Sequence, residues 1–261
     1  PRFLVLVGKG HNGGDALLAA KHLLKTIPTA RAVIWCIGPW DQCRPLCQRA
    51  YRDLIELAGK RVEEVENIKS LSGIKKLESV YQEIIEKAGF SASIDGIVGM
   101  GAKLPIRAPL AAFFSMINQS DGISVRAAVD LPSGLTEDSE KEILRADFTY
   151  ATGIAKTPVF ENRNLQWTGR LRYLDLGFFD EHLEEFEYQK DRVVKKRPLE
   201  NYRTLRSASS DKRSNGHLFL LAGSRNFAGA AMMSAQAALK AGVGLLTVGI
   251  PESLHASFAA Q

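Results

Sequence analysis

The sequence predicts an α/β protein in which helices cover both faces of a mostly parallel sheet. Short apolar segments alternate along the chain with segments of helical periodicity, which is the pattern of strand–helix–strand units. The first strand, FLVLV at residues 3–7, is apolar at every position, as expected of a strand that is buried on both faces. Polar, glycine-rich turns follow three of the strands, at the edge where open parallel sheets bind ligands.

The first part of the chain, residues 1–186, is expected to form one α/β domain. Its strands are predicted from continuous or alternating apolar residues, and its helices from apolar residues three and four positions apart. The predicted strands are residues 2–8, 31–38, 92–99, 124–130, 146–153 and 169–177. The predicted helices are residues 14–27, 42–58, 75–88 and 109–118, and glycines open the first of them.

The strand–glycine–helix pattern restarts after a polar stretch at residues 187–213. A strand at 216–224, a helix at 227–242 and a strand at 244–251 follow it. Domains usually need about 100 residues or more, so we expect 214–261 to be the beginning of a second α/β domain: either its remainder is missing, or this piece packs on another surface. Because the chain opens two residues before a strand, we also expect that an N-terminal segment is missing.

The positive charge of the chain is concentrated in one segment. The formal net charge is +5, but residues 189–213 alone carry +6 and the remaining 236 residues carry −1. This segment is either a solvated linker or a phosphate-binding patch, and we expect no nucleic-acid partner. No apolar run reaches the length of about 18 residues that a membrane helix needs, so no membrane partner is expected either.

The cysteines favour a reducing compartment. There are three of them, Cys36, Cys43 and Cys47. A small, odd number of cysteines argues against a disulfide framework. Their spacing does not match the C-x2–4-C pairs of zinc sites, so we expect plain thiols. We predict a cytoplasmic protein.

Three polar clusters follow predicted strands and are expected to meet at one edge of the sheet. They are GKGHNGGD at 8–15, DGIVGMGAKLP at 95–105 and DLPSG at 130–134. Their side chains are hard oxygen donors, which suit a hard cation or a hydroxyl-rich ligand, and no His/Cys cluster indicates a transition metal. A glycine-rich turn that opens a helix also suits phosphate. The oxygen donors are Asn12, Asp15, Asp95, Asp130 and Ser133.

Each cluster also has a plainer interpretation. Gly8, Gly10 and Gly13 satisfy G-x-G-x-x-G, which describes either a tight strand–helix turn or a dinucleotide loop. A dehydrogenase needs an acid at the end of the second strand, and here Asp41 comes late, which disfavours that class. DLPSG could be an ordinary turn, Asp95 a cap and His11 a loop residue. Lys156 is equally consistent with a surface residue and with a ligand contact.

Two other enzyme classes lack their motifs in this sequence. The nucleophile elbow G-x-S-x-G of α/β-hydrolases is absent. The phosphate loop G-x-x-x-x-G-K-[ST] is absent as well.

Taken together, the clusters and the strands around them resemble the YjeF N-terminal domain, the NAD(P)H-hydrate epimerase family. The resemblance covers about residues 1–180 and rests on GKGHNGGD, SIDGIVGMG, AAVDLPSGL, ADFTYATGIAK and GRLRYLDLG in this order. The stretch that begins GHLFLLAGSRNFAGAAMMSAQ resembles the start of the ADP-dependent NAD(P)H-hydrate dehydratase, a ribokinase-like domain. The resemblance therefore implies a Rossmann-like three-layer αβα domain followed by the beginning of a ribokinase-like domain.

The resemblance implies a role in metabolite repair. NADH and NADPH that become hydrated at C6 of the nicotinamide ring (NADHX and NADPHX) exist as R and S forms, which the epimerase interconverts. The dehydratase then removes water from the S form with ADP or ATP. This chain would carry the epimerase activity, whereas dehydration would need the full-length protein. The family also implies K+ as a cofactor and a homo-oligomer, a dimer or larger.

The resemblance also assigns site residues. Asp130 would contact the substrate. Because Asp130 stands at a strand end beside Ser133, we also expect it to be the catalytic residue, which either transfers a proton or orients the 6-hydroxyl group. Potassium would be bound by Asn12, Asp95 and Ser133. The remaining substrate contacts would be His11, Asn12, Gly13, Gly14, Asp15, Gly99, Met100, Gly101, Ala102, Lys103, Leu104 and Pro105.

The chain departs from the family pattern at several positions. The family loop reads Asn-Asn-Gly-Gly-Asp-Gly, so His11 and Ala16 replace its first and last residues, and Met100 stands where Thr is usual. These departures leave the predicted potassium ligands and Asp130 in place. A related domain also serves as a noncatalytic scaffold or RNA-binding module, and the basic segment would favour that alternative here.

Overall fold

The computed structural model describes residues 1–66, 68, 74–86, 89–99, 101, 105–106, 108–138, 141–178 and 208–259. The chain divides into two compact units, residues 1–187 and 188–261, which are described separately. Several predicted substrate contacts, Met100, Ala102, Lys103 and Leu104, lie outside the described residues, as does the basic segment up to residue 207.

The first unit is built on one seven-stranded sheet in which every strand pair is parallel. The strand order is β3-β2-β1-β4-β5-β6-β7, so the direction of winding reverses between β1 and β4. In open α/β sheets the crevice at this reversal is the usual ligand site. The strands are β1 (Arg2–Val7), β2 (Arg31–Cys36), β3 (Val62–Val65), β4 (Ala92–Gly96), β5 (Arg126–Val129), β6 (Phe148–Thr152) and β7 (Arg170–Leu174).

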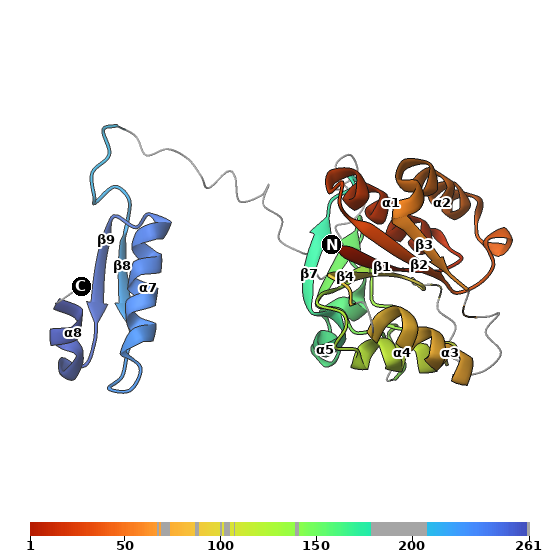
Figure 1. Ribbon diagram of the computed structural model, residues 1–261. Coiled ribbons are helices and arrows are strands. Elements are labelled where there is room, and N and C mark those ends of the chain that lie inside the picture. Colours follow the sequence, from red (N-terminus) through yellow and green to blue (C-terminus); the bar gives the residue numbers. More distant parts are fainter. Residues whose placement is uncertain are drawn as a thin grey trace. The chain divides into compact units, whose positions relative to one another are not determined.

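Helices cover both faces of this sheet (Figure 1). Helices α1 (His11–Thr26) and α2 (Pro45–Ala58) pack on one face, and α3 (Ile74–Tyr81) and α4 (Leu110–Gln119) on the other. Alternate residues of β1 serve the two faces: Val5 lies in the core under α1, and Leu4 in the core under α4. The predicted three-layer α/β fold is therefore confirmed.

Most predicted elements of the first unit are present with shifted ends, but some were missed. Strand β3, the short helix α5 (Leu165–Thr168) and several 3-10 turns carry too few apolar residues to give a periodic signal. Helix α1 begins at His11, three residues before the predicted start, so the glycines lie inside its first turn. The predicted helix 75–88 is α3 followed by a π-helix at Gln82–Glu86, and residues 87 and 88 lie outside the described part.

Glycines allow β1, α1 and β4 to approach one another with no side chain between them. A Cβ on Gly8 would lie 1.7 Å from the carbonyl oxygen of Ile97, and one on Gly13 would lie 2.1 Å from the carbonyl oxygen of Gly8. A Cβ on Gly96 would lie 2.5 Å from the Cβ of Ala16. These glycines are therefore required by packing between backbones, whatever ligand they also serve.

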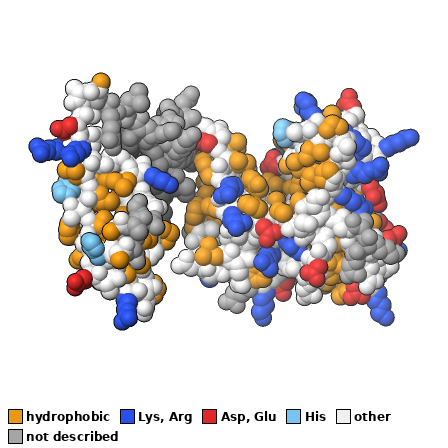
Figure 2. Space-filling view, turned by 60° about the vertical axis from the view of Figure 1, so that its left-hand side comes forward, with side chains coloured by type: hydrophobic (Ala, Val, Ile, Leu, Met, Phe, Trp, Pro, Cys, Tyr) orange, Lys and Arg blue, Asp and Glu red, His pale blue; other side chains and the backbone are white. Residues whose placement is uncertain are grey.

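The second unit contains a parallel pair of strands, β8 (His217–Leu221) and β9 (Leu245–Gly249), joined through α7 (Ala228–Ala241). This is the predicted β-α-β pattern, and the helix α8 (His255–Ala259) follows it. Leu221 is 80% exposed and Phe219 is 64% exposed, and Figure 2 shows hydrophobic side chains on the surface of this unit. The two strands and two helices of this unit do not supply enough cover to bury such side chains.

No helix within the described ranges has both the length and the apolar character that crossing a bilayer requires.

The close approach of the backbones gives a first prediction. Gly13→Ala should destabilise the first unit by about 3 kcal/mol or more, because the new methyl group meets the backbone of Gly8. The measurement is urea unfolding followed by far-ultraviolet circular dichroism. Gly10→Ala is the matched control, since a Cβ on Gly10 meets nothing within 4 Å and should change stability little. Equal stability of the two variants would contradict this packing.

Candidate active site at the carboxyl ends of the strands

The predicted site residues converge where β1, β4 and β5 end. The N–H of Gly8 donates to the carbonyl oxygen of Gly96 at 3.0 Å, which joins the ends of β1 and β4. The first turn of α1 lies on this junction. A Cβ added to Gly99 would lie 3.8 Å from the Cβ and the Cγ of Asn12. The structure therefore brings the first two clusters together, as predicted.

Asp95 and Ser133 form a buried bridge between the ends of β4 and β5. The Oγ of Ser133 donates to Asp95 Oδ1 at 2.6 Å, and the N–H of Ser133 donates to Asp95 Oδ2 at 2.7 Å. Asp95 Oδ1 also accepts from the N–H of Ile97 at 3.1 Å, and the N–H of Val98 donates to Ser133 Oγ at 2.8 Å. Asp95 is only 5% exposed and Ser133 is fully buried, so the DLPSG segment is more than an exposed turn.

The carboxylate of Asp95 has no cation beside it. Burial raises its pKa to about 6, although the hydrogen bonds from Ser133 and Ile97 act in the opposite direction. All three donors are neutral, and no ion pair within the described residues includes Asp95. A buried carboxylate without a counter-charge is costly, so this position suits a bound cation.

The side chain of Asn12 supplies a second reason to expect a ligand. Its Nδ2 is buried and has no hydrogen-bond partner in the described part of the chain. A rotation of the amide by half a turn would place the carbonyl oxygen where the nitrogen now lies. Asn12 can therefore offer an oxygen to a cation held near Asp95 and Ser133, which form the other predicted ligands.

Asp130 lies at the end of β5 in a backbone conformation that L residues rarely adopt, with φ of +69°. Its N–H donates to the carbonyl oxygen of Tyr150 at 2.8 Å. Its Oδ1 accepts from the Oγ1 of Thr152 at 3.1 Å, from the N–H of Thr152 at 3.4 Å, and from the ammonium group of Lys156. Strained backbone that is held by its surroundings is common at functional sites.

Lys156 is therefore part of this site. The sequence left a surface position and a ligand contact equally open, but the side chains of Lys156 and Asp130 are only 16% and 15% exposed. The signal that could have favoured the site is its position four residues after a strand that ends beside β5.

Asp15, on α1, interacts electrostatically with Asp130. Asp15 remains exposed, but the protein around it removes part of its water, and this raises the pKa of its carboxyl. The electrostatic interaction with His11, one helical turn earlier, opposes the increase, and the charge of Asp130 adds to it. His11 and Asp15 therefore belong to the same electrostatic environment as Asp130, which the sequence did not establish for His11.

The second predicted substrate loop is described only in part. Gly99 lies against Asn12, Pro105 is exposed, and a Cβ on Gly101 would meet nothing within 4 Å. The substrate contacts assigned to residues 99–105 stay predictions.

The three cysteines are free and buried, as plain thiols should be. Burial raises the pKa of Cys36 and that of Cys47 to about 12, which makes both poor nucleophiles at neutral pH. The Sγ of Cys47 donates to the carbonyl oxygen of Gly8 at 3.6 Å, so this thiol supports the glycine-rich turn. No group of three His, Cys, Asp or Glu side chains in the described ranges could hold a metal ion.

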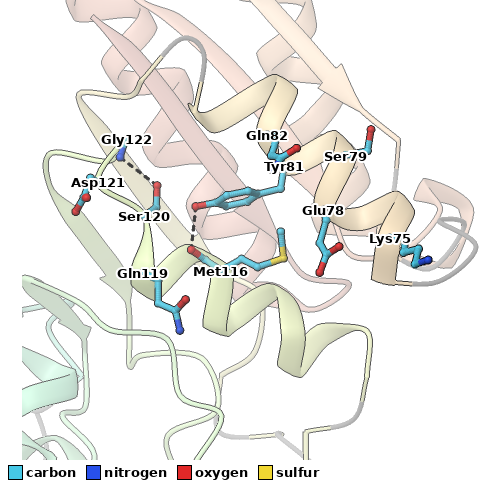
Figure 3. A pocket seen from close by; sticks show the side chains of 10 residues that line it. All are labelled: Lys75, Glu78, Ser79, Tyr81, Gln82, Met116, Gln119, Ser120, Asp121 and Gly122. Atoms are coloured by element: carbon cyan, nitrogen blue, oxygen red, sulfur yellow. Dashed lines mark hydrogen bonds between the residues drawn. The ribbon is translucent and has the colours of Figure 1, made fainter.

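A cavity of about 700 Å³ opens between α3, α4 and the turn before β5 (Figure 3). It lies at the amino ends of β4 and β5, and none of the predicted site residues lines it. At its wall, the hydroxyl of Tyr81 on α3 donates to the carbonyl oxygen of Met116 on α4 at 2.9 Å. The cavity and the carboxyl-edge site are therefore separate features.

The fold and the site define a Rossmann-like α/β domain with an oxygen-lined site where its strand order reverses. Comparison with known families identifies it further. The family model described as YjeF-related protein N-terminus matches residues 1–158, and the chain belongs to this family. A second model, described as NAD(P)H-hydrate dehydratase, matches residues 218–261.

Curated relatives match both parts of the chain. A protein of Gloeobacter violaceus named bifunctional NAD(P)H-hydrate repair enzyme Nnr is 33% identical, over 100% of this chain and 48% of its own length. A Synechocystis protein of the same name is 29% identical, over 100% of this chain and 46% of its own length. The chain thus spans about half the length of the curated relatives it matches.

A solved structure supports the fold alone. The crystal structure of yeast ynu0 (YNL200c) aligns with a TM-score of 0.50 at 18% identity, covering 66% of this chain and 64% of the yeast chain.

The buried bridge between β4 and β5 gives a second prediction. Ser133→Ala should destabilise the first unit by about 1–3 kcal/mol, because Asp95 Oδ1 and the N–H of Val98 each lose a buried partner. The measurement is again urea unfolding. Ser124→Ala, at an exposed position, is the matched control and should change stability by less than about 0.5 kcal/mol. A Ser133→Ala variant as stable as the control would show that the bridge is dispensable.

Proposed function

We propose that residues 1–186 form an NAD(P)H-hydrate epimerase, which interconverts the R and S forms of NADHX and NADPHX at C6 of the nicotinamide ring. The family, and the name that the relatives carry, support this choice. The observation that carries the proposal is Asp130, an ion-paired carboxylate fixed at a strand end, across from Asn12 and Asp15 on α1.

Asp130 can perform the reaction by moving one proton between two atoms of the substrate. The carboxylate takes the proton of the 6-hydroxyl group, a carbonyl forms at C6, and the C6–N1 bond breaks with its electron pair going to N1. The same proton then passes to N1. Rotation about C5–C6 and the reverse steps close the ring on the opposite face, so atoms and charges balance. A carboxylate held close to a reacting hydroxyl is a suitable general base.

The turn formed by GKGHNGGD would bind and orient the dinucleotide. The first N–H groups of α1 have no partner inside the helix and suit a phosphate. Gly13 and Gly14 are buried against Gly8 and Cys47 and so bring this turn close to the strand ends. Asp15 can accept a hydrogen bond from a ribose hydroxyl. Holding the ring beside Asp130 converts binding into orientation.

We propose K+ as the cation, with Asn12, Asp95 and Ser133 among its ligands. Two observations on the described residues support this: none of them forms an ion pair with the buried carboxylate of Asp95, and none forms a hydrogen bond with Nδ2 of Asn12. When bound, the ion would supply a fixed positive charge next to the phosphate-binding turn.

The second unit is proposed to be the opening of a dehydratase domain that uses ADP or ATP, with residues 187–213 as the linker. The family match at 218–261 and the greater length of the relatives support this. The short β-α-β unit should not catalyse dehydration alone. A cytoplasmic location and a dimer or larger homo-oligomer stay predictions.

The two alternatives have less support. The relatives that match the whole chain are named as repair enzymes, which does not support a noncatalytic scaffold. A dehydrogenase would need an acid at the end of β2, but β2 ends at Cys36 and Asp41 lies in a separate 3-10 turn.

The proposed proton transfer gives a third prediction. Asp130→Asn should lower the rate of epimerisation by about 100-fold or more, because the amide cannot accept the hydroxyl proton. The measurement is chromatographic separation of the R and S forms over time, starting from one pure form. Asp121→Asn is the matched control and should keep the wild-type rate, because Asp121 lies in the turn before β5, at the amino ends of the strands. An unchanged rate in Asp130→Asn would remove Asp130 from the mechanism, and an inactive wild-type chain would contradict the proposed function.

The proposed cation site gives a fourth prediction. KCl should raise the thermal unfolding midpoint of the chain relative to tetramethylammonium chloride at equal ionic strength, because only the small cation fits between Asp95, Asn12 and Ser133. Differential scanning fluorimetry measures the shift, and Asp95→Asn should abolish the difference between the two salts. The same midpoint in both salts for the wild-type chain would argue against a K+ site.

A further inference from the structure

The two carboxylate oxygens of Asp130 have different environments. Oδ1 is surrounded by donors: the N–H and the hydroxyl of Thr152, and the ammonium group of Lys156. Oδ2 receives no hydrogen bond from any residue that the structure describes. A carboxylate held through one oxygen presents the other in a defined direction, so Oδ2 is the oxygen available to a substrate proton.

The turn after β6 brings Lys156 back toward β5. Gly153 takes φ of +67°, and the N–H of Ile154 donates to the carbonyl oxygen of Thr152 at 2.7 Å. The carbonyl oxygen of Lys156 then accepts from the N–H of Val159, a buried residue, at 3.2 Å. The backbone on both sides of Lys156 is thus tied down, and its ammonium group is held at Asp130.

In the described part of the chain, Lys156 is the residue that forms an ion pair with Asp130. The pair is largely shielded from water, where a charge–charge interaction is stronger than on the surface. On α1, burial raises the pKa of Asp15, the interaction with His11 acts in the opposite direction, and the charge of Asp130 adds to the increase.

We propose that Lys156 is a positioning residue for the epimerase: it binds Oδ1 of Asp130, fixes the direction of the carboxylate, and so leaves Oδ2 to exchange the proton with the substrate. This inference rests on the proposed function of the site. Thr152 donates hydrogen bonds to the same oxygen but carries no charge, so the charge of the lysine is the property that the reaction needs.

The test compares Lys156→Met and Lys156→Arg with Lys21→Met, which removes a half-buried ion pair with Asp53 on α2. We expect Lys156→Met to lower kcat by about 100-fold with little change in KM, because Asp130 is no longer held in place. Lys156→Arg keeps a positively charged donor at Oδ1 and should restore most of kcat, and Lys21→Met should match the wild type.

A purely structural lysine would behave differently. Its loss would lower the amount of active protein and the unfolding midpoint, and Lys156→Arg would fail to restore kcat; that result would overturn the inference. So would a Lys156→Met variant with the wild-type kcat.

A crystal structure of Lys156→Met separates this inference from the proposed function. We expect the carboxylate of Asp130 to turn away from Thr152, and an unchanged carboxylate would overturn the positioning role even if the wild-type chain proved inactive as an epimerase.

Discussion

The site depends on direct contact between backbones. This contact lies where β1 ends, α1 begins and β4 ends. Gly8, Gly13 and Gly96 permit it, since a side chain at any of them would occupy space already filled. This contact sets the first turn of α1 directly over the reversal of strand order, with Asn12 beside Gly99. The phosphate-binding property of such a turn is therefore a consequence of a packing requirement that the chain must meet in order to fold.

Two carboxylates at neighbouring strand ends acquire different roles from their surroundings. Asp95 is buried and bonded to neutral donors through both oxygens, which makes it a structural link and a candidate cation ligand. Asp130 is bonded through one oxygen, paired with a lysine, and held in a strained backbone conformation. Under the proposed function, these different surroundings separate a carboxylate that would bind a cation from one that would react with the substrate.

The sequence predicted the sheet and the convergence of the polar clusters because both follow from rules of parallel strands. Strand β3 escaped prediction since Val62-Glu-Glu-Val65 is short and half charged at the edge of the sheet. The early start of α1 was missed because glycine is read as a helix breaker, whereas here tertiary contact decides. Lys156 could not be assigned either, because its contact with Asp130 depends on the turn at Gly153, whose direction no periodicity encodes.

The central claim is that the ligand binds at the carboxyl edge of the sheet with its reactive ring at Asp130. A crystal structure of the chain soaked with K+ and NADPH, a dinucleotide that lacks the 6-hydroxyl group, tests it most directly. The account predicts the pyrophosphate at the first turn of α1, K+ near Asp95 and Ser133, and C6 of the nicotinamide ring facing Asp130 Oδ2. A dinucleotide bound in the cavity between α3 and α4, or one whose nicotinamide ring lies away from Asp130, would contradict the account.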